Sequence, residues 1–262
     1  MNLLYKYYSN ESEYAFENLK NGEICFTPLE MLNDPFEGVG KCIYEVDERE
    51  RKYWDAIGID FPKLLADRTT EDYRDALNFK CRVFCSSREC NNALLWAYYA
   101  NSHRGFCVGY EEKNIANISD ELVDITYSEN MCSVNELDEF TLSNLLKIKS
   151  IEWKHENEKR ALYILKNEDV NHYNAETYYD NKLHIKDKMY KLHGYAQCNN
   201  LETLCADKYI LKKCKPTVIY LGLKMEENDK CRIINIAQNY SARVFQMVQD
   251  DNSFALSSYE CK

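Results

Sequence analysis

The stretch LLWAYYANSHRGFCVGYE, from Leu94 to Glu111, carries in order the signals of a helix, a tight turn and a strand. Asn91 or Asn92 precedes the aromatic first half and suits the role of a helix cap. Gly105 permits a tight turn, and the segment FCVGY that follows is typical of a strand. We therefore expect a helix–turn–strand unit whose aromatic and basic side chains form one wall of a pocket.

The composition is that of a folded domain. The chain has 262 residues, of which 45% are hydrophobic, so it can bury a sizeable core. It contains 8 Gly and 4 Pro, and such low numbers argue against disorder and against domains joined by linkers. Strand and helix patterns mix without a strict βαβ repeat. We predict one α+β domain over residues 1–262, with a mixed, mostly antiparallel sheet, flanking helices and a helical insertion near residues 45–79.

Local patterns predict individual elements along the chain. Helices are expected at 47–57, 62–79, 134–151, 200–213 and 226–238. Strands are expected at 3–9, 23–27, 80–86, 106–110, 121–127, 159–165 and 216–223, and a strand pair closes the chain. Residues 166–199 are polar and rich in Tyr and Asn, and their pattern predicts no particular element.

Charge and cysteine content limit the partners. The net charge of −10 opposes binding to a phosphate backbone, so nucleic acid is not an expected partner, although the lysines within 182–191 leave a local basic groove open. The N-terminus has no signal-peptide pattern and no apolar run approaches ~20 residues, so we expect no membrane association.

Twelve cysteines, mostly in apolar segments, then indicate buried free thiols in a reducing cytoplasm. No metal is expected, because His193, Cys198 and Cys205 match no common zinc spacing.

The segment from Trp153 to Arg160 is the first candidate for chemistry. If a strand begins near Glu156, then Glu156, Glu158 and Arg160 share one face, because side chains alternate along a strand. Repulsion between the two glutamates raises the pKa of one of them, which suits acid–base catalysis. The pair could equally bind ribose hydroxyls and stabilise an oxocarbenium ion. The structural alternative is an ion pair between Arg160 and one glutamate at a solvated strand end.

The loop from Asn33 to Gly38 is the second candidate. Asn33 and Asp34 are typical of a structural Asx turn that joins two elements. Alternatively, the loop lies on the rim of a site, to which Asp34 or Glu37 contributes as a metal ligand or general base.

Further residues have both a structural and a functional interpretation. His103 and Arg104 suit either an anion-binding site or the C-terminus of a helix. Trp96 and Tyr99 suit either the core or a stacking platform. Lys6 suits either a sheet edge or a contact with a ligand phosphate.

Several short motifs, spread over almost the whole chain, together resemble the bacterial domain-of-unknown-function family 2971. The family name implies no activity. The chain departs from the family pattern at Tyr8, Tyr98 and Lys159. The motifs are residues 4–7, 19–23 with Phe26, 33–37, 85–86, Leu95-Trp96 with Tyr99-Ala100, 102–105, and Glu156, Glu158 and Arg160.

The first strand, the segment NGEICF and the late Glu-x-Glu strand also resemble the layout of ADP-ribosyltransferase-like toxins. This resemblance implies that Lys6 or Tyr7 holds NAD. It also implies that Trp96 or Tyr99 packs on the nicotinamide ring and that Glu158 is catalytic. Breaking the N-glycosidic bond places positive charge on the ribose, which a nearby carboxylate stabilises.

These features predict a bacterial defence- or toxin-like protein with a nucleotide-binding cleft. NAD would be the substrate of ADP-ribosyl transfer or hydrolysis, with a macromolecule as a further acceptor. One alternative is a sensor of a nucleotide-like or anionic ligand without turnover, and another is a metal-dependent nuclease using Asp34, Glu37 and the lysines of 182–191. The expected catalytic residues are Glu158 and Glu156. The expected ligand-binding residues are Lys6, Tyr7, Asn33, Asp34, Trp96, Tyr99, His103, Arg104 and Arg160.

Overall fold

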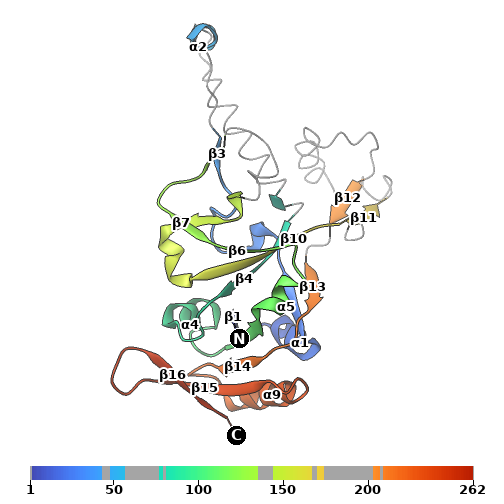
Figure 1. The fold of residues 1–262 in the computed structure, drawn as a ribbon, viewed down its shortest axis with the longest axis vertical. Helices are drawn as coiled ribbons and strands as arrows, with labels where there is room; N and C mark the ends of the chain where they lie inside the picture. Colours follow the sequence, from blue (N-terminus) through green and yellow to red (C-terminus); the bar gives the residue numbers. More distant parts are fainter. Residues whose placement is uncertain are drawn as a thin grey trace.

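Eight strands of the computed structural model form one sheet, in the order β16-β15-β14-β5-β1-β4-β10-β6 (Figure 1). All neighbours are antiparallel except β14 and β15, which confirms the expected α+β class and the mostly antiparallel sheet. The structure describes residues 2–42, 48–56, 77–78, 81–134, 144–166, 170–173, 203–206 and 209–261. The strands of this sheet are β1 (Leu3–Tyr8), β4 (Cys81–Ser87), β5 (Phe106–Glu111), β6 (Glu121–Asp124), β10 (Glu158–Ile164), β14 (Val218–Leu221), β15 (Arg243–Gln249) and β16 (Leu256–Glu260).

Shorter strands pair outside the central sheet. The antiparallel pairs are β2 (Glu23–Phe26) with β13 (Ile210–Lys213) and β11 (Val170–Tyr173) with β12 (Thr203–Ala206). The parallel pairs are β3 (Lys41–Cys42) with β8 (Ser133–Val134) and β7 (Thr126–Ser128) with β9 (Ile148–Ser150). The named helices are α1 (Glu13–Asn21), η1 (Leu29–Met31), α2 (Glu48–Ala56), α4 (Ala93–Tyr99), α5 (Glu112–Ala116), η2 (Ile151–Glu156) and α9 (Glu227–Gln238).

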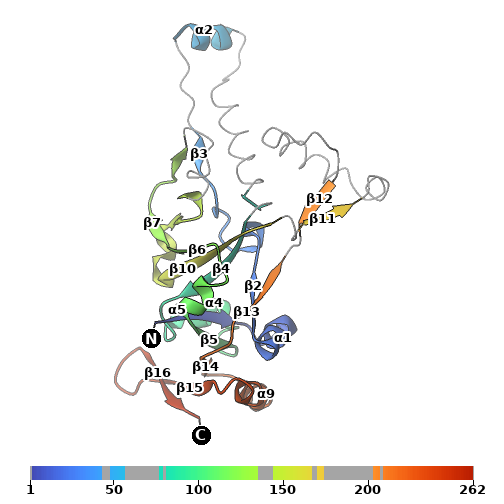
Figure 2. The same ribbon diagram turned by 45° about the vertical axis from the view of Figure 1, so that its right-hand side comes forward.

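Helices cover both faces of the sheet at β5. Phe16 of α1 and Ile233 of α9 share a buried cluster with Val108, whereas Trp96 of α4 packs in another cluster with Cys107. Successive side chains of a strand point to opposite faces. α1 and α9 therefore lie on one face and α4 on the other, and Figure 2 shows α1 and α9 beside the lower strands of the sheet.

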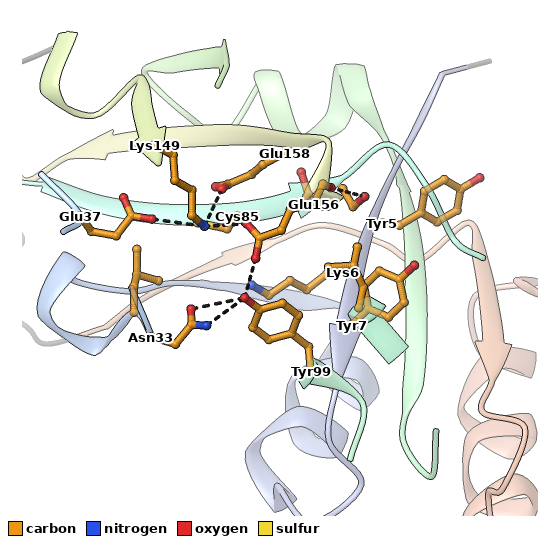
Figure 3. Close-up of a pocket in the computed structure, with 14 residues that line it drawn as sticks. Tyr5, Lys6, Tyr7, Asn33, Glu37, Cys85, Tyr99, Lys149, Glu156 and Glu158 are labelled. Atoms are coloured by element: carbon orange, nitrogen blue, oxygen red, sulfur yellow. Dashed lines mark hydrogen bonds and ion pairs between the residues drawn. The ribbon is translucent and has the colours of Figure 1, made fainter. Parts of the chain in front are cut away.

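The sheet is weakly joined at its centre. β1 pairs with β5 along its whole length, and β4 pairs with β10 along its whole length. Between β1 and β4 there is a single register pair, Tyr5 with Ser87. The two halves diverge beyond this pair, and β1 crosses β4 steeply in the close-up of Figure 3. Backbone divergence of this kind leaves room for side chains and for a ligand between the two strands.

The predicted helix–turn–strand unit is present as α4, a turn and β5. Asn92 is the cap, since its side chain accepts hydrogen bonds from the amides of Leu94 and Leu95 at 3.1 and 3.3 Å. Gly105 has an ordinary φ, but a Cβ there would lie 2.0 Å from the carbonyl oxygen of Tyr8. Glycine is therefore required at this position by the close approach of β1 rather than by the conformation of the turn.

Three expected elements differ from the structure. The helix expected at 134–151 is wrong at both ends, where β8 and β9 lie, and residues 135–143 fall outside the described residues. The helix expected at 200–213 is wrong because β12 and β13 pair with distant strands. The strand expected at 121–127 is two strands, since β6 pairs with β10 and β7 with β9. Pairing with strands remote in sequence overrides local propensity in each case.

The expected insertion near 45–79 begins with a helix, because α2 is present, and most of residues 57–80 lie outside the described part. Nine cysteines of the described residues are free thiols, but only Cys81, Cys107 and Cys214 of them are buried as expected. Among the described helices, none is both long and apolar enough to cross a membrane.

Replacing Gly105 by Ala should destabilise the protein by about 2–3 kcal/mol, because the added methyl overpacks against the β1 backbone. Urea unfolding measures the free energy of unfolding and its slope with denaturant. Ser102→Ala, an exposed change in the same turn, is the control and should stay within about 0.5 kcal/mol of the parent. Equal stabilities of the two variants would contradict this interpretation of Gly105.

Candidate functional site

A pocket opens where β1 and β4 diverge (Figure 3). Its cavity volume is about 90 Å³, below the range of complete small-molecule sites, so it accommodates part of a ligand rather than a whole one. β1, β4, α4, the 32–37 loop, β9, η2 and β10 all contribute side chains to its walls. The site is therefore assembled from segments that are far apart in the sequence.

Arg160 on β10 organises the charged floor of the pocket. Its two terminal nitrogens donate to the two carboxylate oxygens of Glu37, both at 2.8 Å. Its Nε and one terminal nitrogen donate to Glu158 at 2.9 and 3.2 Å, and a further bond reaches the Leu146 carbonyl at 3.1 Å. A guanidinium has five N–H donors, so each has a partner within the protein. Since Arg160 is 0% exposed, its role is to hold the two glutamates, and it has no donor left for the ligand expected from the sequence.

Lys149 on β9 is the second cation of the floor. Its ammonium donates to Glu156 at 2.6 Å and to Glu158 at 3.2 Å, and lies 3.4 Å from Glu37. Burial lowers the pKa of Lys149, but the three carboxylates outweigh burial and raise it above its ordinary value. Lys149 is therefore a permanent cation that links all three acids.

Glu156 connects this floor to the wall formed by α4. Tyr99 donates its hydroxyl hydrogen to Glu156 at 2.5 Å and accepts a hydrogen bond from the amide of Asn33 at 3.0 Å. Burial, followed by the hydrogen bond and charge of Glu156, raises the pKa of Tyr99. The tyrosine is therefore neutral at physiological pH and acts as a hydrogen-bond donor to the carboxylate.

Glu156 and Glu158 reach the pocket from two different elements rather than from one strand. Glu156 is the last residue of η2, and Asn157, with φ 45°, turns the chain before β10 begins at Glu158. The condition for a shared strand face, a strand that begins near Glu156, is therefore not met, although both carboxylates line the pocket.

The pKa of Glu158 moves down rather than up. Burial alone would raise the pKa, but the charges of Arg160 and Lys149 and the hydrogen bonds from Arg160 lower it to about 2. The expectation that one glutamate of the pair is raised is thus not met at Glu158, because two cations separate the acids. Glu158 is ionised at neutral pH and cannot serve there as a general acid.

Lys6 on β1 extends into the same pocket (Figure 3). Its ammonium lies 5.5 Å from the ring centroid of Phe84, and within the described part of the chain it has no carboxylate at ion-pairing distance. The neighbouring Tyr7 lines the pocket wall, and its hydroxyl donates to the carbonyl of Glu89 at 2.7 Å. Lys6 is thus the pocket cation whose charge is available to a ligand.

Cys85 lies on β4 between these charges. Burial, followed by the charge of Glu158, raises the pKa of its thiol to about 12. The thiol is therefore protonated at neutral pH, which argues against a thiolate nucleophile in this pocket.

The two acidic residues of the 33–38 loop, Asp34 and Glu37, have different roles. Asp34 is buried and accepts a hydrogen bond from the amide of Phe36 at 2.9 Å, as in an Asx turn. It does not line the pocket, so its side chain shapes the loop that delivers Glu37 to Arg160. No cluster of three metal-ligating side chains occurs among the described residues, and the lysines of 182–191 fall outside them.

The turn after α4 does not join the pocket. Trp96 is fully buried, and its indole donates to the carbonyl of Cys90 at 2.8 Å. His103 stacks on Trp96 and lines a separate hollow with Lys224, while Arg104 is exposed. Burial, and then the charge of Lys224, lowers the pKa of His103. The structure therefore brings together Lys6, Tyr7, Asn33, Tyr99, Glu156, Glu158 and Arg160, and places Trp96, His103 and Arg104 elsewhere.

Lys149 was not expected from the sequence. It lies in a stretch whose pattern favoured a helix, and a lysine there indicates only a solvated surface. Had the segment IKSI been assigned to a strand, a lysine in an apolar strand would have been the signal.

Replacing Arg160 by Met should destabilise the protein by about 3–5 kcal/mol, because Glu37 and Glu158 would remain buried without their main partner. Arg243→Met is the matched control, since Arg243 makes a similar pair with Glu260 on the surface. Chemical denaturation of both variants checks this. A loss at Arg160 no larger than the loss at Arg243 would contradict the proposed role of the network.

Glu158 should make the free energy of unfolding depend on pH in the acidic range. Its folded pKa of about 2 lies below the ordinary 4.5, so the unfolded chain binds the proton more readily. The contribution of Glu158 is therefore full above about pH 5 and is lost as the pH falls towards 2. Unfolding free energies across this window should fall more steeply for the parent than for Glu158→Gln, and parallel curves would argue against the ionised carboxylate.

No family model matches the sequence, and neither a curated protein nor a solved structure shows significant similarity to it. The resemblances noted in the sequence remain expectations. The geometry of the pocket is therefore the basis for assigning a function.

Proposed function

We propose that the pocket binds a nucleotide-like ligand and that this ligand is NAD, whose nicotinamide–ribose bond is broken for hydrolysis or ADP-ribosyl transfer. The observation that supports this most is the ionised, buried carboxylate of Glu158, which faces a cavity that also contains the available cation Lys6. A role in bacterial defence or toxicity would follow from the family resemblance.

The charge state of Glu158 suits this bond. When the N-glycosidic bond of NAD breaks, its electron pair leaves with nicotinamide and neutralises the pyridinium ring. The leaving group thus needs no proton, unlike the alcohol released by ordinary glycoside hydrolysis. Positive charge develops on the ribose, and a fixed carboxylate stabilises it without reorganisation. Water, or an acceptor nucleophile, then forms the new bond to C1′ and gives up a proton.

The neighbouring charges have different tasks in this proposal. Lys149 and Arg160 are held by three carboxylates, so they position Glu156 and Glu158 and do not bind phosphate. Lys6 supplies the cation for the pyrophosphate. Tyr99 and Asn33 fix the second carboxylate, Glu156, at the wall of the same pocket.

A second candidate is a sensor that binds a nucleotide without turnover. It is favoured by the completeness of the ion network, in which Arg160 and Lys149 already have all their partners within the protein. Such a pocket is formed in advance and can bind a ligand without rearrangement. Thermal stabilisation by NAD without any released nicotinamide would favour the sensor.

Purified protein incubated with NAD, with and without cell extract, should release nicotinamide. Glu158→Gln should lower the rate by about 100-fold or more, because a fixed charge opposite the ribose is lost. Lys6→Gln should mainly raise KM, by about tenfold, with little change in the free energy of unfolding, since Lys6 belongs to no ion pair in the described structure.

Glu260→Gln, a change at the exposed pair with Arg243, is the control and should leave the rate unchanged. Circular dichroism and thermal unfolding establish that each variant is folded. Absence of nicotinamide release by the folded parent protein would contradict the proposed enzymatic activity. An unchanged rate in Glu158→Gln would contradict the proposed catalytic role of Glu158.

A further inference from the structure

A second hollow adjoins the pocket on its outer side. Asn33 and Tyr99 line both cavities, and the other walls of the outer hollow are Tyr98 of α4 and Glu152, Trp153 and His155 of η2. The two cavities therefore share the wall formed by Asn33 and Tyr99, which are hydrogen-bonded to each other. The inner pocket contains Lys149, Glu156 and Glu158, whereas the outer hollow is lined by Tyr98, Trp153 and His155 together with Glu152.

Trp153 links the two compartments. The ammonium of Lys149 lies 4.9 Å from the centroid of its ring, while the ring also lines the outer hollow. Tyr98 is 60% exposed and makes edge contacts with Tyr99 and His155, with centroids 6.4 and 6.0 Å apart. Tyr99, Trp153 and His155 are half-buried, so each leaves part of a ring accessible, and aromatic rings around a hollow are a recurrent feature of sites that stack planar groups.

His155 adds a polar atom to this wall. Its Nδ1 lies 2.9 Å from the carbonyl oxygen of Glu152, so this nitrogen carries the hydrogen and donates. Nε2 is then an acceptor, and it is shielded from solvent and has no partner. His155 lines the outer hollow beside Tyr98, so an amino group that enters the hollow would be a donor for Nε2. A buried acceptor without a donor costs free energy, which such an amino group would recover.

We propose that the outer hollow binds the adenine base of the nucleotide whose ribose occupies the inner pocket. Adenine is planar, so it stacks on Trp153 and Tyr98, and its exocyclic amino group supplies the donor that His155 lacks. This inference rests on the proposed nucleotide function of the inner pocket and assigns the other end of the same ligand.

Trp153 provides a signal that does not depend on turnover. The chain has 3 Trp, so the emission of Trp153 is obtained as the difference between the parent and Trp153→Phe. AMP should quench this emission in a saturable way, whereas nicotinamide mononucleotide, which has no adenine, should not. Tyr98→Leu should weaken AMP binding about tenfold by calorimetry, because stacking on one ring is lost.

Tyr14→Leu is the matched control, because Tyr14 is 78% exposed on α1 and lines neither cavity. It should change the affinity for AMP by less than about twofold. IMP, in which a carbonyl replaces the amino group, should bind at least about fivefold more weakly than AMP. Equal binding of IMP and AMP would overturn the assignment of adenine, and so would unchanged AMP binding in Tyr98→Leu.

The outcomes also separate this inference from the proposed reaction. AMP binding that depends on Tyr98, in a protein that releases no nicotinamide, would support the adenine site and reject the enzyme. Nicotinamide release with a KM for NAD unaffected by Tyr98→Leu and Trp153→Phe would support the enzyme and reject the adenine site.

Discussion

The guanidinium of Arg160 is the group on which the site depends. It is completely buried, and its five donors join β10 to the 33–38 loop and to the backbone before β9. Burying a charge costs several kcal/mol unless hydrogen bonds and opposite charges compensate for it. Glu37 and Glu158 provide that compensation, and their remaining charge in turn holds Lys149. The network thereby fixes three segments around one cavity.

Stability alone does not explain such a network, because well-packed apolar side chains would stabilise the same space at least as well. What the ions provide is an oriented, ionised carboxylate at the cavity wall. Three glutamates face two paired cations, so the cluster of Glu37, Glu156, Glu158, Lys149 and Arg160 carries one net negative charge. Lys6 offsets it from the opposite strand, and the cavity can thus accept a ligand that is anionic at one end and cationic at the other.

The sequence predicts several strands and site residues, but it does not predict the ion pairs at the centre of the site. Strands such as β1, β4 and β10 show clear local patterns, and the candidates Lys6, Asn33, Tyr99 and Glu158 do meet. The pairing of Glu37 with Arg160 spans 123 residues, and no local pattern reports such a contact. The strands β9 and β13 were missed because their partners are distant, so local patterns favoured helices. Trp96 was placed beside Tyr99 in the expected site, but α4 turns the indole into the core and only Tyr99 towards the acids.

The most direct measurement is a crystal structure of the protein with ADP-ribose, the part of NAD that remains after nicotinamide has left. We expect a ribose whose hydroxyls bind the Glu158 carboxylate, with the adenine packed on Trp153 and Tyr98. A ligand bound outside the cavity between β1 and β4, or one that leaves Glu158 without any contact, would contradict this expectation.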